Sequence, residues 1–170
     1  MRHFRNGRIV LAAAALLGAC SNSLEDEAGL GVDPNAAGGA GGAGSIEESS
    51  IEYFNVQVGD RVFFATDSSE LDSVAIQTLT RQARWLNDYS SADIVLEGHA
   101  DERGTRDYNL ALGARRATAA RNFLLSQGVP AERIRVVSYG KERPVALCSD
   151  ESCWGQNRRA VTVVAGGPTS

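Results

Sequence analysis

The chain has 170 residues, of which 17 are lysine or arginine and 21 are aspartate or glutamate, and its formal net charge is −4 at pH 7. A chain of this length suits one folded domain rather than several. The acidic balance argues against a nucleic-acid partner, because non-specific binding needs clustered positive charge that displaces counterions from phosphates.

The N-terminus has the layout of a secretory signal. Three arginines precede a short apolar run over residues 9–17, and small residues lead from there to Cys20. The run is too short to span a bilayer. A buried N-terminal helix is the alternative, but it would leave the arginines and the small residues unexplained. We predict that residues 1–19 are a signal peptide, whose removal takes three positive charges from a chain of −4 and leaves −7.

Residues 17–20, Leu-Gly-Ala-Cys, resemble the lipobox of bacterial lipoproteins. The resemblance implies that Cys20 becomes the first residue and carries a diacylglycerol thioether and an acylated amine. Several acyl chains are needed for a lasting anchor, since one chain binds a membrane only marginally. The residue after the cysteine is Ser21 and not an aspartate, which favours the outer membrane over the inner membrane.

Residues 20–50 are predicted to be the lipidated cysteine followed by a flexible tether. They include six acidic residues and no basic one, and residues 36–45 are nearly all glycine and alanine. Such a segment cannot bury enough apolar surface to offset the entropy of ordering it. The folded domain is therefore expected over residues 51–170.

Within residues 51–170, β-rich and helical patterns alternate. Strands are predicted at residues 61–65, 94–97, 134–139 and 159–165, and a long loop is predicted at 140–156. One helix is predicted to begin at a cap at residue 72 or 73 and to end within residues 88–91, and a second is predicted over residues 109–127. The order β-α-β-α-β-β predicts an α/β domain. We expect a two-layer α+β sandwich in which two helices cover one face of a mixed sheet.

Residues 98–117 place an acid and two arginines close together. Asp101 follows the second predicted strand in a loop bounded by glycines, and Arg115 and Arg116 lie early in the next helix. An aspartate binds an ammonium group and an arginine binds a carboxylate through two hydrogen bonds, so the set suits a zwitterionic ligand. The alternative is a plain ion pair between Asp101 and Arg116, which would give little stability at the surface.

The sequence shows no set of catalytic residues. His99 is the only histidine of the domain and no serine lies in a nucleophile motif, so we expect His99 to be buried and hydrogen-bonded. Asp101 could pair with Glu97 or Glu102 for glycan hydrolysis, but neighbours on a strand or loop point to different sides. We therefore predict a binding module and not an enzyme.

Cys148 and Cys153 are the two cysteines of the predicted domain. A tetrahedral metal site would need further ligands, and the only histidines, His3 and His99, are not near them in sequence. An exported, oxidising setting favours a disulfide between the two cysteines, with two free buried thiols as the alternative. We expect no metal and no cofactor.

Three further residues near the C-terminus are expected to have structural roles. Trp154 is expected to pack against the disulfide rather than to form an exposed platform for a sugar. Of Arg158 and Arg159, one is expected to hold the loop around Asp101 or its acids, and the other is expected to be solvated.

Four motifs, taken in this order, resemble the OmpA-like peptidoglycan-binding family and in particular its lipid-anchored members. They are Gly98–Thr105, Asn109–Ala117, Val137–Pro144 and Asn157–Val161. The similarity covers about residues 58–165, and the cysteine pair is not part of the family's pattern. The resemblance implies a domain that binds the meso-diaminopimelate of the peptidoglycan stem peptide without cutting it.

The resemblance also implies roles for single residues. Asp101 matches the aspartate that holds the ammonium group, and Arg116 matches the arginine that holds the carboxylate. Asn109 matches an asparagine that braces the loop, and Thr66 and Asp67 match the turn that lines the pocket. The predicted ligand-binding residues are Thr66, Asp67, Asp101, Asn109, Leu112 and Arg116.

At the level of the cell, the resemblance implies a lipoprotein of the outer membrane whose domain faces the periplasm. It would link the outer membrane to the cell wall and bind the periplasmic propeller protein of the Tol system, with a role in envelope integrity and cell division. An enzyme that cleaves peptidoglycan and a flagellar stator-like protein are the alternatives. The stator would need a true membrane span, for which residues 9–19 are too short.

Overall fold

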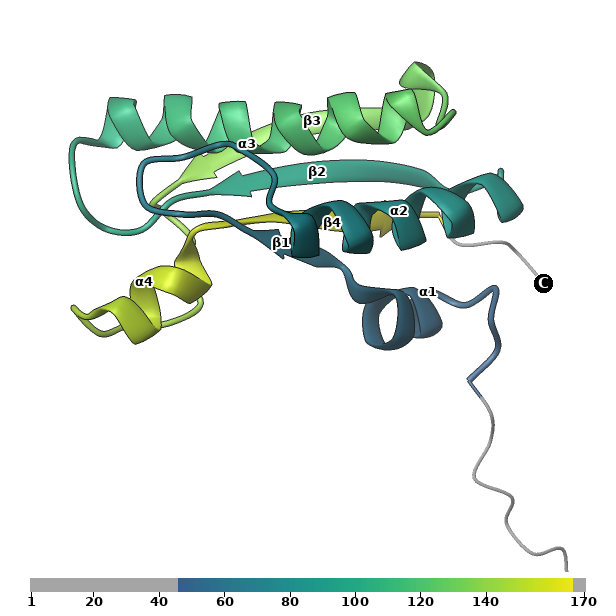
Figure 1. Ribbon diagram of the computed structural model, residues 1–170, viewed down its shortest axis with the longest axis horizontal. Helices are drawn as coiled ribbons and strands as arrows, with labels where there is room; N and C mark the ends of the chain where they lie inside the picture. The colour runs from purple at the N-terminus through teal and green to yellow at the C-terminus, as the bar shows by residue number, and fades with distance from the viewer. Residues whose placement is uncertain (1–45, 167–170) are drawn as a thin grey trace, which may run out of the picture. The chain divides into compact units, whose positions relative to one another are not determined.

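The computed structural model describes residues 46–166. The predicted signal peptide, Cys20 and most of the predicted tether lie outside these residues. The domain is built on a four-stranded sheet in the order β1-β4-β2-β3 (Figure 1). Its strands are β1 (Arg61–Phe63), β2 (Asp93–His99), β3 (Ile134–Gly140) and β4 (Arg159–Ala165).

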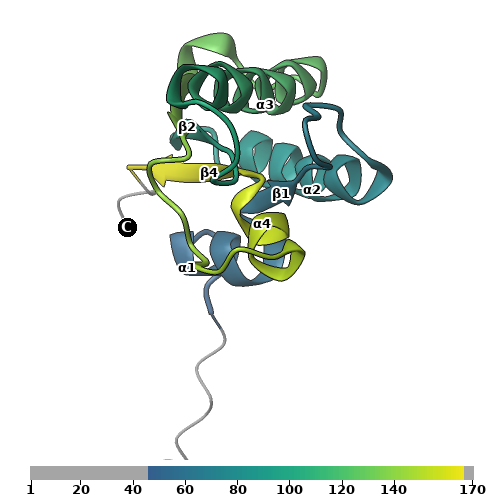
Figure 2. The ribbon, with the colours of Figure 1, turned by 90° about the vertical axis from the view of Figure 1, so that its left-hand side faces the viewer.

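The sheet is mixed, as the sequence predicted. β2 and β3 are parallel, whereas β4 runs antiparallel to both of its neighbours, β1 and β2. Helices α2 (Ser73–Asp88) and α3 (Arg106–Ser126) cover one face of the sheet (Figure 2). The predicted α/β class and two-layer arrangement are therefore confirmed.

The two long helices begin at capping residues and bury one face each. The Asp72 carboxylate accepts a hydrogen bond from the Ala75 amide at 2.7 Å, and the Thr105 hydroxyl accepts one from the Tyr108 amide at 3.3 Å. The core between helices and sheet consists of apolar residues that are almost fully buried. They include Leu79, Leu86, Ile94, Leu96, Ala117 and Leu124.

Helix α3 lies directly on β2. Gly98 and Gly113 meet backbone to backbone, and a Cβ at Gly98 would overlap the carbonyl oxygen of Gly113. Only glycine allows two backbones to approach so closely. The contact brings the first turns of α3 over the end of β2, so that Asn109 lies beside the loop that contains Asp101.

The N-terminal part of the domain holds helical turns that were not predicted. The short helix α1 (Ile51–Tyr53) continues into the π-helical segment η1 (Phe54–Gly59) before β1 begins. Phe54 is fully buried and its ring centroid lies 4.8 Å from that of Trp85. The Trp85 indole also donates a hydrogen bond to the Glu48 carbonyl oxygen at 2.7 Å. These tertiary contacts stabilise the segment.

The other differences from the prediction lie at element ends and in the loop at 140–156. That loop contains helix α4 (Glu151–Asn157), which begins where the Asp150 carboxylate accepts a hydrogen bond from the Ser152 amide at 2.8 Å. A 3-10 turn, η2 (Ala131–Arg133), precedes β3. Strand β1 is two residues shorter than predicted, and α3 begins three residues earlier because Thr105 caps it. Within residues 46–166 no helix is long and apolar enough to cross a membrane.

Candidate functional site

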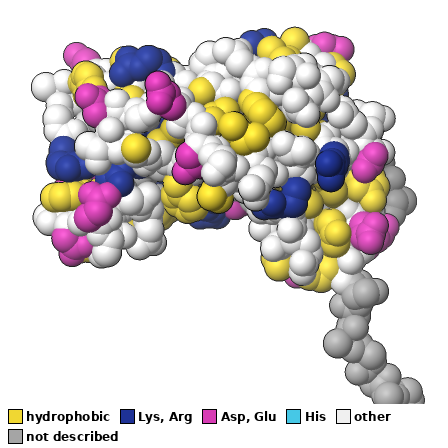
Figure 3. All heavy atoms as spheres, viewed as in Figure 1, with side chains coloured by type: hydrophobic (Ala, Val, Ile, Leu, Met, Phe, Trp, Pro, Cys, Tyr) yellow, Lys and Arg dark blue, Asp and Glu magenta, His cyan; other side chains and the backbone are white. Residues whose placement is uncertain are grey.

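A pocket of about 330 Å³ opens where β2 ends, between the turn after β1, the loop after β2 and the start of α3. Its lining residues are Thr66, Asp67, Asp101, Arg103, Gly104, Tyr108, Asn109 and Leu112. Five of the six predicted ligand-binding residues are thus brought together, and Arg116 is the exception. Positive and negative side chains are interspersed on the face shown in Figure 3.

Asp101 is the buried acid of this pocket. Its Oδ1 accepts hydrogen bonds from the amide and the Nε of Arg103, both at 3.2 Å. Its Oδ2 accepts from Arg103 Nη2 at 2.6 Å and from Arg158 Nη1 at 3.4 Å. Burial by itself raises the pKa of Asp101, but the hydrogen bonds from the two arginines outweigh it and hold that pKa below its usual value. Asp101 is therefore ionised at neutral pH.

Arg116 lies behind the pocket and is fully buried. Its guanidinium donates to the carbonyl oxygens of Ser68 at 2.8 Å, His99 at 2.9 Å and Ala65 at 3.0 Å. Burial lowers the pKa of Arg116 to about 10, which leaves it charged at neutral pH. Arg116 therefore ties the turn after β1 to the end of β2. Within the described residues it forms no ion pair with Asp101, so the plain pair that was the alternative is not found.

The loop after β2 is held at several points along its backbone. Asn109 Nδ2 donates to the Arg103 carbonyl oxygen at 2.7 Å, which is the kind of bracing contact predicted for it. Lys141 Nζ donates to the carbonyl oxygens of Glu102 at 3.1 Å and Gly104 at 2.6 Å. The position of Asp101 is thus set by α3 and by the segment after β3.

The opposite wall of the pocket is formed by the turn after β1. Asp67 has a positive φ of 54°, the only such value among the described residues other than glycine. The Tyr108 hydroxyl donates a hydrogen bond to the Asp67 carboxylate, which joins this turn to α3. Tyr108 was not predicted as a site residue, although it precedes Asn109 in the motif.

His99 is buried, but it is not hydrogen-bonded as predicted. Neither ring nitrogen has a hydrogen-bond partner within the described residues, and the ring stacks on Tyr139 with centroids 5.6 Å apart. Burial, together with the positive charges of Arg159 and Arg143, lowers the pKa of His99 to about 4. His99 is therefore neutral at physiological pH, and its ring does not line the pocket.

Arg158, which ends α4, and Arg159, the first residue of β4, are both buried. Arg158 donates to Asp101, to the Glu151 carboxylate and to the Phe64 carbonyl oxygen, so it is the residue that holds the pocket acids. One of the two was expected to be solvated, and this was wrong, because Arg159 is buried as well. Its guanidinium donates to the carbonyl oxygens of Asn157 at 3.3 Å and Arg143 at 3.2 Å.

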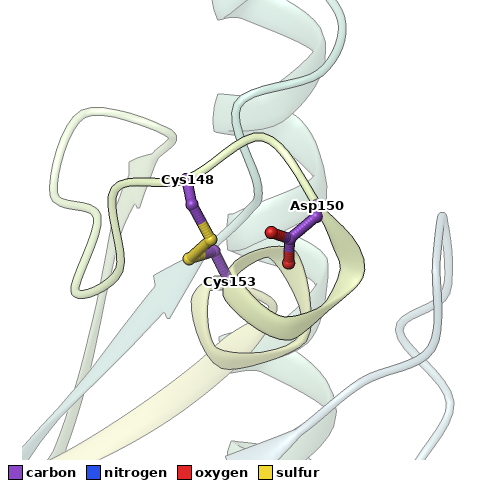
Figure 4. Close-up of side chains that lie close together, drawn as sticks. All are labelled: Cys148, Asp150 and Cys153. Atoms are coloured by element: carbon purple, nitrogen blue, oxygen red, sulfur yellow. A yellow bond between two sulfur atoms is a disulfide. The ribbon is translucent and has the colours of Figure 1, made fainter.

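The cysteine pair joins helix α4 to the segment before it. Cys148 and Cys153 form a disulfide with Cα atoms 5.5 Å apart, and Asp150 lies beside it (Figure 4). The sulfurs and the Asp150 carboxylate lie within 4.8 Å of one another. Because the sulfurs are bonded to each other, they offer no thiolates to a metal ion, and the carboxylate caps α4. Trp154 faces the pocket loop, where its Nε1 donates to Glu102 Oε1 at 3.2 Å.

The chain is similar in sequence to a known protein family and to several of its members. Residues 63–159 match the OmpA family. The chain is 56% identical over 165 residues to the peptidoglycan-associated lipoprotein of Agrobacterium fabrum, which covers 95% of this chain and 89% of that protein. It is 61% identical over 135 residues to the protein of the same name from Mesorhizobium japonicum, covering 78% of this chain and 80% of that one.

Solved structures show the same fold. The crystal structure of the peptidoglycan-associated lipoprotein from Burkholderia pseudomallei matches with a TM-score of 0.63 and 40% identity, over 65% of this chain and 96% of that one. The C-terminal domain of Helicobacter pylori MotB matches with a TM-score of 0.60 over 64% of this chain and 86% of that one. At 20% identity the second likeness concerns the fold alone.

Proposed function

The chain belongs to the OmpA family, and from this premise we propose that its domain binds peptidoglycan without cutting it. The ligand would be the diaminopimelate of the stem peptide, and the site would be the pocket around Asp101. The observation that carries the proposal is an ionised carboxylate in a pocket that is also lined by a guanidinium. The relatives are named for their association with peptidoglycan, and this name supports the same ligand.

The lining of the pocket suits such a ligand. Ionised Asp101 binds the ammonium group, and a guanidinium binds the carboxylate. The Leu112 side chain gives the methylene chain an apolar surface, and Thr66 adds a hydroxyl. Arg116 was predicted to hold the carboxylate. Its guanidinium would have to give up a backbone carbonyl or open the turn after β1 to do so, because it is fully buried.

We propose binding rather than catalysis. His99 is neutral but buried, with its ring outside the pocket, so it does not reach a substrate there. Asp101 is held ionised by two arginines, which makes it a poor proton donor for glycan hydrolysis.

The wider role follows from the sequence of the N-terminal segment. We propose that Cys20 is lipidated, that residues 20–50 are a tether, and that the domain faces the periplasm from the outer membrane. The protein would then link the outer membrane to the cell wall. The proposed protein partner is the periplasmic propeller protein of the Tol system, in a role in envelope integrity and cell division.

The test of the binding function is co-sedimentation with purified peptidoglycan. Asp101→Asn keeps the size of the side chain but removes its charge, so the variant should stay in the supernatant while the parent protein pellets. Asp107→Asn is the matched control, because this acid lies in the first turn of α3 and is exposed. Circular dichroism should show that both variants are folded. If Asp101→Asn still pellets, the site is wrong; if soluble wall fragments are released, the protein is a hydrolase.

A further inference from the structure

A second pocket, of about 240 Å³, lies where the helical turns before β1 pack against the second half of α2 (Figure 1). It shares no residue with the pocket around Asp101. Three aromatic, two acidic and two arginine side chains line it, together with Gln57 and Val58. Its volume is below the range of about 300–1,000 Å³ that is usual for small-molecule sites, so it suits a single side chain presented by a larger partner.

Aromatic rings form much of the wall of this pocket. The ring centroids of Trp85 and Tyr89 lie 5.0 Å apart, and Tyr53 lines the pocket beside them. The Trp85 indole already donates to the Glu48 carbonyl oxygen at 2.7 Å, so it offers the pocket no free donor. The face of an aromatic ring carries partial negative charge and attracts a cation within about 6 Å of its centre. The walls therefore favour a positively charged group.

The two acids of the pocket, Glu48 and Asp88, have no charged partner. Neither forms a salt bridge within the part of the chain that the structure describes. Partial burial and the negative charges of Glu48 and Asp88 raise the pKa of Tyr89, so both carboxylates lie close to this ring. Asp88 also lies in the last turn of α2, which holds no basic residue. A negative charge at that end of a helix is unfavourable to the helix itself, so stability does not explain it.

The two arginines of the pocket leave these acids available. Arg81 donates to the Val58 carbonyl oxygen at 3.2 Å and to the Thr78 hydroxyl at 3.1 Å, so its guanidinium joins α2 to η1. Arg84 lies one helical turn before Asp88, which is the less favourable order for an ion pair on a helix. Arg84 forms no salt bridge among residues 46–166. An incoming cation therefore finds two free carboxylates and one opposing charge.

We propose that this pocket binds an arginine side chain of a partner protein. A guanidinium stacks on an aromatic face and donates two parallel hydrogen bonds to a carboxylate, and the pocket offers both kinds of group. A lysine ammonium is a compact, strongly hydrated charge that does not stack in this way. The site is separate from the pocket around Asp101, so the partner and a ligand of that pocket can be bound at the same time. The inference does not rest on the proposed function.

The test compares two probes that differ in charge, Nα-acetyl-arginine amide and Nα-acetyl-citrulline amide. Citrulline has the shape of arginine but carries a neutral urea group. Each probe is titrated into the full chain in a non-ionic detergent, and the shift of the Trp85 indole N–H resonance gives the dissociation constant. The arginine probe should bind with a dissociation constant of about 1–10 mM and about fivefold to tenfold more tightly than the citrulline probe. The Trp154 indole resonance is the internal control, because Trp154 lies by the loop after β2 and should not shift.

Substitutions in the pocket should act in opposite directions. Asp88→Asn and Glu48→Gln should each weaken binding of the arginine probe about twofold to fourfold, whereas Arg84→Gln should tighten it about twofold, since it removes a like charge. A general loss of structure would weaken binding in every case. Asp93→Asn is the matched control, because this acid is exposed at the start of β2 and does not line the pocket. Circular dichroism establishes that each variant is folded.

Two further probes identify the kind of cation. Nα-acetyl-lysine amide should bind about threefold more weakly than the arginine probe, since an ammonium lacks the planar fork. Choline represents a lipid headgroup, and it should also bind more weakly because its ammonium has no N–H to donate to the acids. Tighter binding of choline would overturn the assignment to a protein side chain. Equal binding of the arginine and citrulline probes would overturn the assignment to a cation.

The same variants separate this site from the proposed function. Asp101→Asn should bind the arginine probe like the parent protein, and Asp88→Asn should still pellet with peptidoglycan. If Asp101→Asn loses the probe while Asp88→Asn keeps it, the probe binds in the other pocket and the inference is overturned. If Asp101→Asn still pellets with peptidoglycan, the proposed function fails, whereas the assignment of the second pocket stands on the probe titrations.

Discussion

At the scale of single residues, burial and neighbouring arginines determine which side chains of the pocket are ionised. Asp101 stays ionised although it is buried, because Arg103 and Arg158 donate to it. Arg116 also stays charged, but its hydrogen bonds go to backbone carbonyl oxygens. Arg103, which is partly exposed, therefore pairs with the acid, whereas Arg116, which is fully buried, holds the backbone together.

The state of Asp101 predicts how binding depends on pH. Its pKa in the folded protein lies below the usual value of 3.8, and the ammonium group binds the ionised form. Affinity for diaminopimelate should therefore be constant from pH 7 to pH 5 and fall as the pH drops through the pKa of Asp101, below 4. The stability that this acid contributes is likewise complete above its unfolded pKa and is lost below the folded one. Calorimetric titration from pH 7 to pH 3 measures the first effect, and a loss between pH 7 and pH 5 would contradict it.

Replacing Arg116 should lower the stability of the domain strongly. Arg116→Ala leaves the carbonyl oxygens of Ala65, Ser68 and His99 without their donor and opens a cavity in place of a fully buried side chain, so the free energy of unfolding should fall by about 3 kcal/mol or more. Arg115→Gln, at the exposed neighbouring position, should change it by less than about 0.5 kcal/mol. Urea denaturation followed by circular dichroism measures both. A loss below about 1 kcal/mol for Arg116→Ala would show that its backbone contacts do not hold the pocket together.

At the scale of elements, what could be predicted from sequence is what local patterns determine. The apolar period of α2 and its cap Asp72 are local, and the alternating valines of β4 are local, so both elements were found close to their true ends. Helix α4 was missed although its Asp150 cap is local, because a helix of seven residues also depends on the disulfide and on the Glu151–Arg158 contact. The turns of η1 were missed because they depend on the burial of Phe54 against Trp85.

The residues of the site also divide into those that the sequence predicts and those that only the folded structure reveals. Five of the six predicted residues line the pocket: Asp101, Asn109 and Leu112 lie in the motifs, and Thr66 and Asp67 lie in the turn after β1. They meet because loops that follow neighbouring strands lie at the same end of the sheet. Arg103 was missed although it lies two residues after Asp101, a spacing that allows its guanidinium to fold back on the acid. The guanidinium of Arg116 is held by three carbonyl groups, two from the turn after β1 and one from the last residue of β2. No pattern along one segment of the sequence reveals such a convergence.

The contact between α3 and β2 gives a prediction for these elements. A methyl group at Gly98 would overlap the backbone of Gly113, so Gly98→Ala should force α3 away from the sheet and cost about 1–3 kcal/mol or more of stability. Gly155→Ala is the control, because Gly155 lies inside α4 and the nearest atoms to its added Cβ would be 3.7 and 3.9 Å away. This change should be neutral or stabilise by about 0.5–1 kcal/mol. Urea denaturation compares the two, and equal effects would refute the close contact.

At the scale of the whole molecule, the proposed function needs two attachments on one chain. The pocket would hold the cell wall, and the lipid on Cys20 would hold the outer membrane. A glycine-rich coil of about 30 residues has an end-to-end distance of roughly 30 Å, so the predicted tether lets each attachment form without constraining the other. Loss of the attachment to the cell wall should then leave the attachment to the outer membrane intact, and the reverse should also hold.

This independence predicts the behaviour of three variants in fractionated cells. Cys20→Ala removes the acyl chains, each CH₂ of which contributes about 0.8 kcal/mol on burial in the membrane, so the protein should leave the outer-membrane fraction but still pellet with peptidoglycan. Asp101→Asn should do the reverse, and the double variant should be found in the soluble periplasm. Detergent extraction followed by immunoblotting of each fraction measures the distribution. If Cys20→Ala stays in the outer membrane, the lipid is not the anchor; if it also loses the wall, the pocket depends on the membrane to hold the domain near its ligand.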